Sequence, residues 1–421
     1  MGEQYMTGQV FLLEDEILVN LARQVSRDLQ QGGTSAVSPF ALLDSCIGLP
    51  AGQEEGVYLA LDFGGTNVRA SRIRLLGHKG YVIEKIVKKP LRLAGVYDHL
   101  SAQETPAGLF DFLAGCIGEA ALPGREYVLG HTFSFAAAQE GAGDARMTAW
   151  SKEAAVPGME GRLVNEMLQQ ALVRRGLERI RPKALVNDTT AVLLAAAYCH
   201  DSVQAAAICG TGFNVCYYEP ATGHIINLEA GNYNRFGGTR WDAILDAQSE
   251  KPGDHTLEKM ISGAYLGELF RLWALDYLPA PKLAPFSTAQ LNELVTMTDV
   301  QAAQRFLASA WSRLIPQSQV EQLQTAAGCL FVRSAQIAGA VCAGVLRHLY
   351  PQGALPEQTI GIEGSVMEKV YGSQIVYDQV LQQALSVDDA GQLRQVPVGS
   401  SFVVDGASVG AAVAAAMIAR L

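Results

Sequence analysis

Apolar residues recur along the chain with helical and with strand spacing, and the two kinds of segment alternate. Helical spacing covers residues 14–31, 106–120, 163–172, 191–198, 256–275, 324–349 and 411–421. Short apolar runs predict strands at 57–61, 81–87, 127–129, 184–186, 205–209, 215–218, 359–362 and 402–404. A soft Gly/Ala-rich loop is expected at 136–146 and a turn at 405–410. This order of elements favours an α/β protein.

The stretch from Val57 to Leu75 predicts a β-hairpin whose tip carries Gly64 and Gly65. Two adjacent glycines let backbone N–H groups approach an anion without a Cβ in the way. Asp62 beside them could hold a hydrated Mg²⁺, because hard cations prefer carboxylate oxygen. Taken alone, the segment fits an ordinary Gly-Gly hairpin turn better than a phosphate cradle.

A second glycine-tipped hairpin favours the phosphate cradle over an ordinary turn. Gly210-Thr211-Gly212-Phe213-Asn214-Val215 lies between two predicted strands and is similar to Gly64-Gly65-Thr66-Asn67-Val68. Each copy opens a segment of strands followed by helices, so the duplication predicts two similar domains that face each other across a cleft. Two phosphate-type turns meeting there fit a nucleoside triphosphate better than two unrelated turns do.

Polar residues also follow a strand at Asn187-Asp188-Thr189-Thr190, where the helix 191–198 is expected to begin. In α/β proteins, ligands bind between the carboxyl end of a strand and a helix N-terminus. Capping of the helix is an equally good interpretation of Thr189 and Thr190, but a weaker one of Asp188. The N-terminus of the last helix is a third potential anion site.

Composition removes several classes of function. The chain has 421 residues, 49% hydrophobic and 18% charged, and a net charge of -10, which argues against nucleic acid as the main partner. The N-terminus lacks a signal-peptide pattern, and the apolar runs 191–199 and 411–419 are too short to span a bilayer. The seven cysteines include no CxxC pair and the seven histidines lack ligand spacing. A cytoplasmic protein with reduced thiols, no membrane partner and no protein-held transition metal is expected.

Common nucleotide and hydrolase motifs are absent or incomplete. No Walker A or GxGxxG pattern occurs. Gly406-Ala407-Ser408-Val409-Gly410 matches the G-x-S-x-G nucleophile elbow, but no Asp, Glu or His follows it to complete a triad. These glycines are instead expected to let a nucleotide lie against the backbone.

Together, several stretches in this order resemble the hexokinase family of sugar kinases. Leu61–Arg69 and Gly210–Asn214 are similar to its two phosphate motifs, and Val186–Thr189 to the segment that holds the catalytic aspartate. Sugar-binding segments of the family are similar to Phe133-Ser134-Phe135, Trp150-Ser151-Lys152, Asn227-Leu228-Glu229 and Glu258–Glu268. Gly364-Ser365 and Asp405-Gly406 resemble its adenosine-side turns. The resemblance extends from about residue 57 to residue 412.

The chain departs from the family pattern at several positions. Ala136 replaces a Pro, Glu153-Ala154 replaces Gly-Phe, and Val409 replaces a Lys on the nucleotide side. Ala230 replaces the Trp of Glu-Trp-Gly and is followed by an unusual loop that ends at Arg235. This loop is expected to reshape the sugar pocket.

The resemblance implies a two-domain actin-like ATPase (ribonuclease H-like) fold, with duplicated mixed-sheet domains around a central cleft. The small domain would comprise residues 57–190 with helix 408–421 returning to it, and the large domain residues 1–56 and 191–407. The implied reaction is transfer of the γ-phosphoryl group of Mg-ATP to the 6-hydroxyl of a hexose, most readily glucose, at the start of glycolysis. Alternatives are a kinase for another hexose or an amino sugar, and a non-catalytic sugar sensor.

The resemblance also implies roles for individual residues. Asp188 would be the catalytic base, and Asp62 would hold Mg²⁺ through water. The sugar would be bound by Ser134, Ser151, Lys152, Asn187, Asp188, Asn214, Glu229 and Glu258. ATP would be bound by Asp62, Gly64, Gly65, Thr66, Asn67, Arg69, Gly210, Thr211, Gly212, Gly364, Ser365, Gly406, Ala407 and Ser408. A homodimer is compatible with the resemblance.

Overall fold

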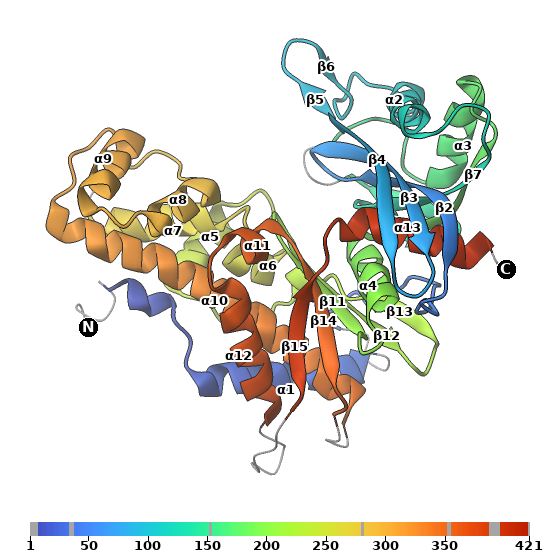
Figure 1. The fold of residues 1–421 in the computed structure, drawn as a ribbon. Helices are drawn as coiled ribbons and strands as arrows, with labels where there is room; N and C mark the ends of the chain where they lie inside the picture. The colour runs from blue at the N-terminus through green and yellow to red at the C-terminus, as the bar shows by residue number, and fades with distance from the viewer. Residues whose placement is uncertain are drawn as a thin grey trace. The chain divides into compact units, whose positions relative to one another are not determined.

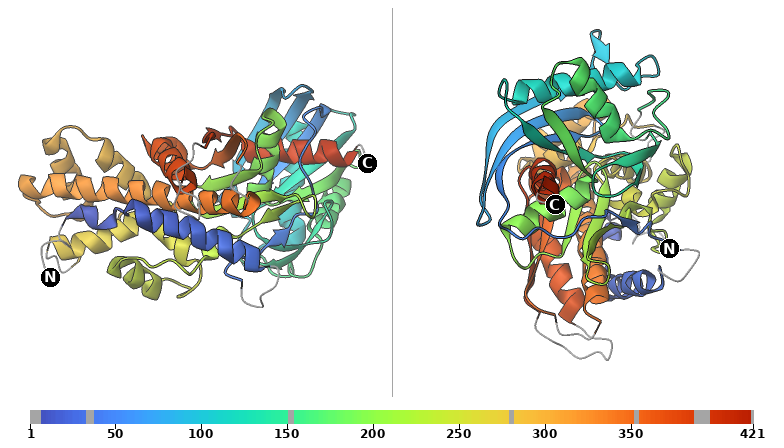
Figure 2. Two further views of the ribbon diagram at one scale, coloured as in Figure 1. Left: turned by 90° about the horizontal axis from the view of Figure 1, so that it is seen from below. Right: turned by 90° about the vertical axis from the view of Figure 1, so that its right-hand side faces the viewer.

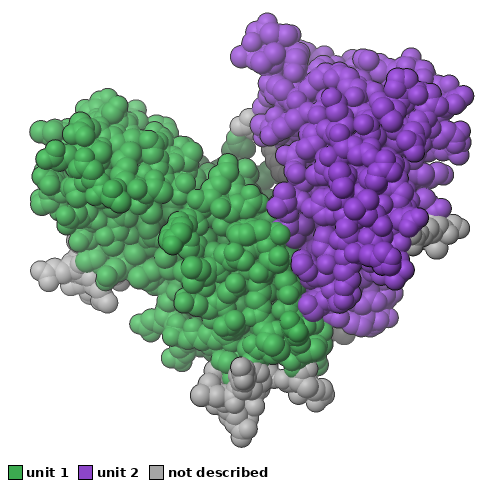
Figure 3. Space-filling view, viewed as in Figure 1, with its two compact units in different colours: residues 1–42, 207–215, 228–402 green, residues 43–206, 216–227, 403–421 purple. Residues whose placement is uncertain are grey.

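The computed structural model describes residues 7–32, 38–150, 154–278, 282–351, 355–386 and 396–419. The chain forms two compact units (Figure 3). Unit 1 comprises residues 1–42, 207–215 and 228–402, and unit 2 comprises residues 43–206, 216–227 and 403–421. Strands β11 (Ala205–Cys209) and β12 (Phe213–Glu219) carry the chain from unit 2 into unit 1 and back. Each unit combines strands and helices, as an α/β protein requires.

The compact units divide the chain at other positions than the predicted domains. Residues 43–56 and 191–206 lie in unit 2 together with residues 57–190. Strand β1 (Leu43–Asp44) pairs there with β13 (His224–Asn227), and the hydroxyl of Tyr198 donates to the carbonyl oxygen of Glu54. The final helix is also in unit 2. That these units are the functional domains of a kinase stays a prediction.

A five-stranded sheet forms the centre of unit 2. Its order is β10-β7-β2-β3-β4, made from β2 (Glu55–Phe63), β3 (Asn67–Leu76), β4 (Tyr81–Pro90), β7 (Tyr127–Phe133) and β10 (Ile180–Val186). Strands β2, β3 and β4 form an antiparallel meander, which confirms the predicted hairpin and third strand. Strands β10, β7 and β2 are parallel, so their carboxyl ends share one edge. Each of these three strands is longer than its apolar run predicted.

Two pairs of helices pack on this sheet (Figure 1). One pair is α2 (Pro106–Ala120) and α3 (Val164–Arg174), and the other is α4 (Asp188–Cys199) and α13 (Gly406–Ala419). The second pair lies close to the sheet, because a Cβ on Gly130 of β7 would come 1.8 Å from the carbonyl oxygen of Ala411. Glycine is therefore required at position 130 for α13 to pack.

The prediction of a loop at residues 136–146 is wrong. Residues Ala136–Gln139 (β8) and Ala145–Ala149 (β9) form an antiparallel hairpin. Alanine has low strand propensity, so the local sequence does not indicate strands. Burial of Ala145 and Met147 in the core of unit 2 stabilises them instead.

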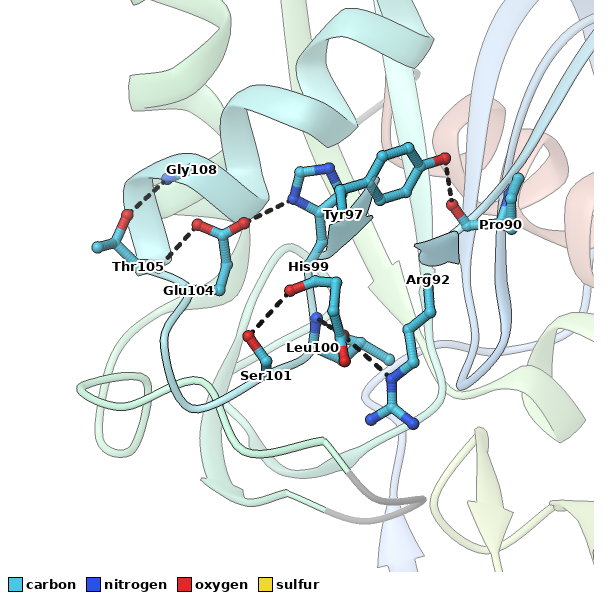
Figure 4. A network of polar contacts seen from close by, with 10 residues as sticks. Pro90, Arg92, Tyr97, His99, Leu100, Ser101, Glu104, Thr105 and Gly108 are labelled. Carbon is cyan, nitrogen blue, oxygen red and sulfur yellow. Dashed lines mark hydrogen bonds and ion pairs between the residues drawn. The ribbon is translucent and has the colours of Figure 1, made fainter. Parts of the chain in front are cut away.

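A network of polar contacts holds the segment before α2 (Figure 4). It includes the short strands β5 (Arg92–Leu93) and β6 (Tyr97–Asp98). Asp98 Oδ1 accepts from Arg92 Nε at 3.1 Å and from the backbone N–H of Leu100 at 2.9 Å. His99 Nδ1 lies 2.6 Å from Glu104 Oε2. These contacts tie the β5–β6 hairpin to the start of α2.

Unit 1 is dominated by helices. Helix α1 (Asp15–Gly32) lies along α10 (Gln317–Leu349), which also packs against α12 (Ser373–Ser386) (Figure 2). A Cβ on Gly344 would come 2.5 Å from the Cβ of Val25, so glycine lets α1 and α10 approach closely. The strands β14 (Gln358–Glu363) and β15 (Val398–Phe402) form a parallel pair in the same unit. The strand predicted at 402–404 is wrong, because β15 ends where that strand was expected to begin.

Helix α10 has the length and hydropathy of a membrane span. Of its most apolar 18-residue window, 89% is buried inside the protein. This burial accounts for the apolar composition of α10 as that of a core helix of unit 1.

The prediction of one long helix at residues 256–275 is wrong. Helices α6 (Thr256–Ile261) and α7 (Leu266–Tyr277) are separated by a break. In the break, the N–H of Gly263 donates to Gly210 O at 2.7 Å, and that of Ala264 donates to Thr211 O at 3.1 Å. Tertiary hydrogen bonds to the second glycine turn replace helical ones. Unit 1 also contains α5 (Arg240–Gln248), α8 (Thr288–Thr296), α9 (Val300–Trp311) and α11 (Ser365–Lys369).

Candidate active site

In unit 2, candidate residues gather at one edge of the five-stranded sheet. Phe63 and Phe133 are register partners at the ends of β2 and β7, and Val186 at the end of β10 pairs with Thr132. Asp62, Ser134 and Asn187-Asp188 therefore lie at the carboxyl ends of three neighbouring parallel strands. This edge is where α/β sheets bind ligands.

Asp188 occupies the first position of α4. Asn187 is the N-cap residue, and its side chain accepts from the N–H of Thr189 at 2.9 Å. Asp188 Oδ1 accepts from the same N–H at 2.8 Å. Capping by Thr189 or Thr190, which was one interpretation of these residues, is wrong, because Asn187 is the N-cap and both threonines lie in the first turn of the helix. Asp188 is partly exposed, and the positive end of the helix dipole stabilises its carboxylate.

The first glycine turn joins β2 to β3 and leaves space around its backbone. A Cβ added to Gly64 would meet nothing closer than Asn67 O at 3.8 Å, which is ordinary van der Waals contact. The carbonyl oxygen of Thr66 accepts from the N–H of Leu91 at 2.9 Å and fixes the far side of the turn. The described neighbours of Gly64 therefore do not require glycine at this position.

The start of α13 differs from the sequence prediction. The helix begins at Gly406, so Gly406, Ala407 and Ser408 belong to its first turn instead of a preceding loop. Asp405 precedes this turn and forms an ion pair with Arg69 of β3. The hydroxyl of Thr132 on β7 donates to Ala407 O at 2.8 Å. The helix N-terminus is thus attached to two strands of the sheet.

Gly410 serves packing within the protein. A Cβ at this position would come 1.8 Å from the carbonyl oxygen of Ala191 on α4. The expectation that this glycine lets a nucleotide approach the backbone is therefore wrong. Val409, which replaces the family's Lys, is fully buried.

In unit 1, Glu258 lies beside the second glycine turn. Its Oε2 accepts from the N–H of Phe213 at 2.9 Å. A Cβ on Gly212 would come 2.7 Å from this oxygen, and one on Gly231 would come 3.0 Å from Glu258 Cβ. Both glycines make room for the glutamate, which directs its carboxylate along the turn.

Asn214 and Glu229 form the next part of this group. Asn214 Oδ1 accepts from the N–H of Ala230 at 3.1 Å, and Asn214 Nδ2 lies 3.4 Å from Glu229 Oε1. Glu229 adopts left-handed backbone angles, with φ 50° and ψ 49°. The structure thus brings Asn214, Glu229 and Glu258 together around residues 212–214.

The second glycine turn also contacts Gly364-Ser365. A Cβ on Gly210 would lie 3.4 Å from Gly364 Cα and from Ser365 N, and Gly364 has φ 121°. Ser365 begins α11, and Glu368 Oε1 accepts from the N–H of Gly364 at 2.9 Å. The predicted phosphate-side and adenosine-side segments of unit 1 are therefore adjacent.

Ionisable groups next to these segments have structural roles. Burial raises the pKa of the Cys209 thiol to about 12, so this residue stays protonated beside the turn. Lys259 follows Glu258 but is buried, and it donates to Asp246 Oδ1 at 2.6 Å and Lys251 O at 2.8 Å. The hydrogen bond from Lys259 lowers the pKa of Asp246. Lys259 thus fastens α6 to α5.

Arg235, at the end of the loop after Glu229, contacts the protein itself. Arg235 forms an ion pair with Asp28 of α1, and the hydroxyl of Tyr233 donates to the same carboxylate at 2.9 Å. That the loop after Glu229 reshapes the sugar pocket stays a prediction. Asp28 was not identified from the sequence as a functional residue. Asp28 shares the apolar face of α1 with Leu21, Val25 and Leu29, and a charged residue on such a face is a signal for a buried ion pair.

Two candidate residues, Ser151 and Lys152, lie outside the described residues. Within the described residues, no group of three or more His, Cys, Asp or Glu side chains could hold a metal ion. The assignment of a water-mediated Mg²⁺ contact to Asp62 stays a prediction.

Comparisons with known proteins agree on one family. Two family models, both described as hexokinase, match residues 7–198 and 204–417. The chain is 27% identical to Hexokinase-1 of Schizosaccharomyces pombe, over 97% of this chain and 89% of that protein. It is 30% identical to Hexokinase-9 of Oryza sativa subsp. japonica, over 92% of this chain and 82% of that protein.

Solved structures extend the agreement to the fold. A hexokinase crystal structure has a TM-score of 0.85 and 29% identity, covering 99% of this chain and 98% of its own. A hexokinase from Schistosoma mansoni, solved with glucose, has a TM-score of 0.80 and 24% identity, over 98% of this chain and 99% of its own. The predicted actin-like sugar-kinase fold is confirmed.

Proposed function

The chain belongs to the hexokinase family, and from this premise we propose that it transfers the γ-phosphoryl group of Mg-ATP to the 6-hydroxyl of a hexose, with glucose preferred. We further propose that it acts in the cytoplasm at the start of glycolysis. The glucose bound to the Schistosoma mansoni hexokinase supports the choice of sugar. The observation that carries the proposal is the position of Asp188, at the carboxyl end of β10 and the N-terminus of α4.

Asp188 acts as the general base in this proposal. Its carboxylate would accept the proton of the attacking hydroxyl, a contribution of roughly 10²–10⁴-fold in rate. Phosphoryl transfer otherwise depends on positioning and charge stabilisation, without a covalent intermediate. The N-cap contact of Asn187 fixes the start of α4 and hence the backbone of Asp188.

The sugar would be recognised by its hydroxyl groups. Carboxylates of Glu229 and Glu258 would accept from them, together with Asn214. In unit 2 the proposed sugar contacts are Ser134 and Asn187, and Ser151 and Lys152 complete the set. A buried acceptor without its hydroxyl partner costs binding energy, so these groups would select against sugars that lack the matching hydroxyl.

ATP would use the glycine turns and helix N-termini. The open space at Gly64 fits close approach of a phosphate to backbone N–H groups. Mg²⁺, when bound, would neutralise phosphate charge, with Asp62 holding it through water. Gly210–Gly212, Gly364-Ser365 and the first turn of α13 are assigned to the nucleotide, since helix N-termini favour anions.

The test is production of ADP from Mg-ATP, with and without glucose, by the native chain and by Asp188→Asn. We expect glucose-dependent ADP that falls at least about 100-fold in the variant, because the amide cannot accept the proton. Asp111→Asn, which removes an exposed ion pair with Arg174, is the control and should retain native turnover.

Other outcomes separate the alternatives. ADP production with another hexose or an amino sugar, but not with glucose, would change the substrate. If no sugar supported turnover while glucose still raised the melting temperature, the protein would be a sugar sensor. Native turnover in Asp188→Asn would refute the assigned base.

A further inference from the structure

A buried polar cluster lies in unit 1, which also contains the proposed sugar-binding glutamates Glu229 and Glu258. Its centre is Asp28 of α1, whose side chain has 0% exposure. Its carboxylate accepts from the hydroxyl of Tyr233 at 2.9 Å and from Gln24 at 3.0 Å, and it forms an ion pair with Arg235. A buried carboxylate is stable only with such partners, so this cluster fixes where Tyr233 lies.

Tyr233 links this cluster to the helix that carries Glu258. Its ring is fully buried and stacks on Phe40, with ring centroids 5.0 Å apart. Its carbonyl oxygen accepts from Thr256 Oγ1 at 3.0 Å, and Thr256 begins α6 two residues before Glu258. Burial and the nearby Asp28 raise the pKa of Tyr233, so its hydroxyl remains a donor.

Tyr233 also ends the short segment that begins at Glu229. The left-handed conformation of Glu229 is unfavourable for a non-glycine residue. Such a conformation persists only where its surroundings impose it. On one side, Ala41 donates to Leu228 O at 3.0 Å, and on the other, Tyr233 donates to Ala230 O at 3.1 Å. The residues that flank Glu229 are thus held through Phe40-Ala41 and Tyr233.

We propose that Tyr233 is a positioning residue that sets the geometry of both sugar-binding glutamates. It acts on Glu229 through the segment 229–233 and on Glu258 through Thr256 and α6. Asp28 and Arg235 hold Tyr233 in place from the side of α1. This inference rests on the proposed function, because it assumes that Glu229 and Glu258 bind the sugar.

The first test is Tyr233→Phe, which removes only the hydroxyl and leaves Asp28 one donor short. We expect the KM for glucose and its Kd without nucleotide to rise roughly tenfold, the loss typical of one misplaced hydrogen bond. The kcat and the KM for ATP should stay within about twofold of native, because the loss falls on sugar binding.

A matched control separates positioning from general loss of stability. Tyr198→Phe, in unit 2, also removes a buried hydroxyl, which donates to Glu54 O at 3.0 Å and Gly80 O at 2.8 Å. It should lower the melting temperature without changing the Kd for glucose. An equal loss of glucose affinity in both variants would overturn the proposal.

Thr256→Val provides a second route if Tyr233→Phe does not fold. It removes the hydrogen bond from Thr256 to Tyr233 O with little change in shape, and the Kd for glucose should again rise severalfold. Glu258→Gln tests the assumption beneath the inference. If Glu258→Gln loses glucose affinity while Thr256→Val and any folded Tyr233→Phe keep the native value, the positioning role alone is overturned. Native affinity in Glu258→Gln as well overturns the proposed sugar site.

Discussion

Gly212→Ala should weaken sugar binding while leaving the fold intact. The added Cβ would come 2.7 Å from Glu258 Oε2, closer than real Cβ contacts allow. The carboxylate is the end of a flexible side chain, so it can move aside at little cost to stability. It would then lose the N–H of Phe213, now at 2.9 Å, and its direction toward the sugar. Loss of one hydrogen bond from a sugar hydroxyl to this carboxylate would remove about 1.5–3 kcal/mol of binding energy, which corresponds to roughly 10–100-fold in affinity.

Calorimetric titration of glucose without nucleotide measures this effect directly. Gly64→Ala is the control, because its Cβ would have 3.8 Å of clearance and it should bind glucose as the native chain does. Omitting nucleotide matters, since Gly212 also belongs to the proposed phosphate turn. Native glucose affinity in Gly212→Ala, with an unchanged melting temperature, would show that Glu258 does not bind the sugar as proposed.

Two further predictions concern stability. Gly130→Ala would place a Cβ 1.8 Å from Ala411 O. It should therefore lower the free energy of unfolding by about 1–3 kcal/mol or more. A native melting curve would contradict the packing of α13 on the sheet. Burial lowers the pKa of His131 from 6.5 to about 4. The unfolded chain therefore binds a proton below about pH 6.5 that the folded chain does not, so stability is greatest above that pH and falls on acidification. Denaturant titrations at pH 7 and pH 4 should differ by about 3 kcal/mol from this group, and His131→Gln should remove that part of the difference.

Helices with clear periodicity could be predicted almost to the residue. Apolar spacing located α2 at 106–120 and α3 near 163–172, because in both cases one face packs on a sheet. Prediction failed where distant contacts determine the backbone. The break between α6 and α7 depends on hydrogen bonds from Gly263 and Ala264 to the turn at 210–211, which no local pattern encodes.

The sequence indicated which residues are candidates for the site, but it did not indicate which contacts those residues make in the structure. Ordered motifs pointed to Asp188, Glu229 and Glu258, whose chemistry is visible in single residues. The ion pair of Arg235 was not predicted, because its partner Asp28 lies 207 residues earlier in the chain. A loop's own sequence does not reveal whether its charged side chain faces a ligand or the protein.

The two glycine turns show the limit of reading function from a repeated motif. Both are hairpin tips with nearly the same sequence, yet their glycines meet different constraints. A side chain at Gly64 would meet no close neighbour, whereas one at Gly212 would strike Glu258. A Cβ at Gly210 would only reach van der Waals contact with the backbone of Gly364-Ser365, at 3.4 Å. At Gly64, the surrounding described residues therefore give no packing reason for glycine. Gly212 makes room for Glu258, so a substitution there disturbs a proposed sugar contact, and substitutions at Gly64 are the cleaner probe of phosphate binding.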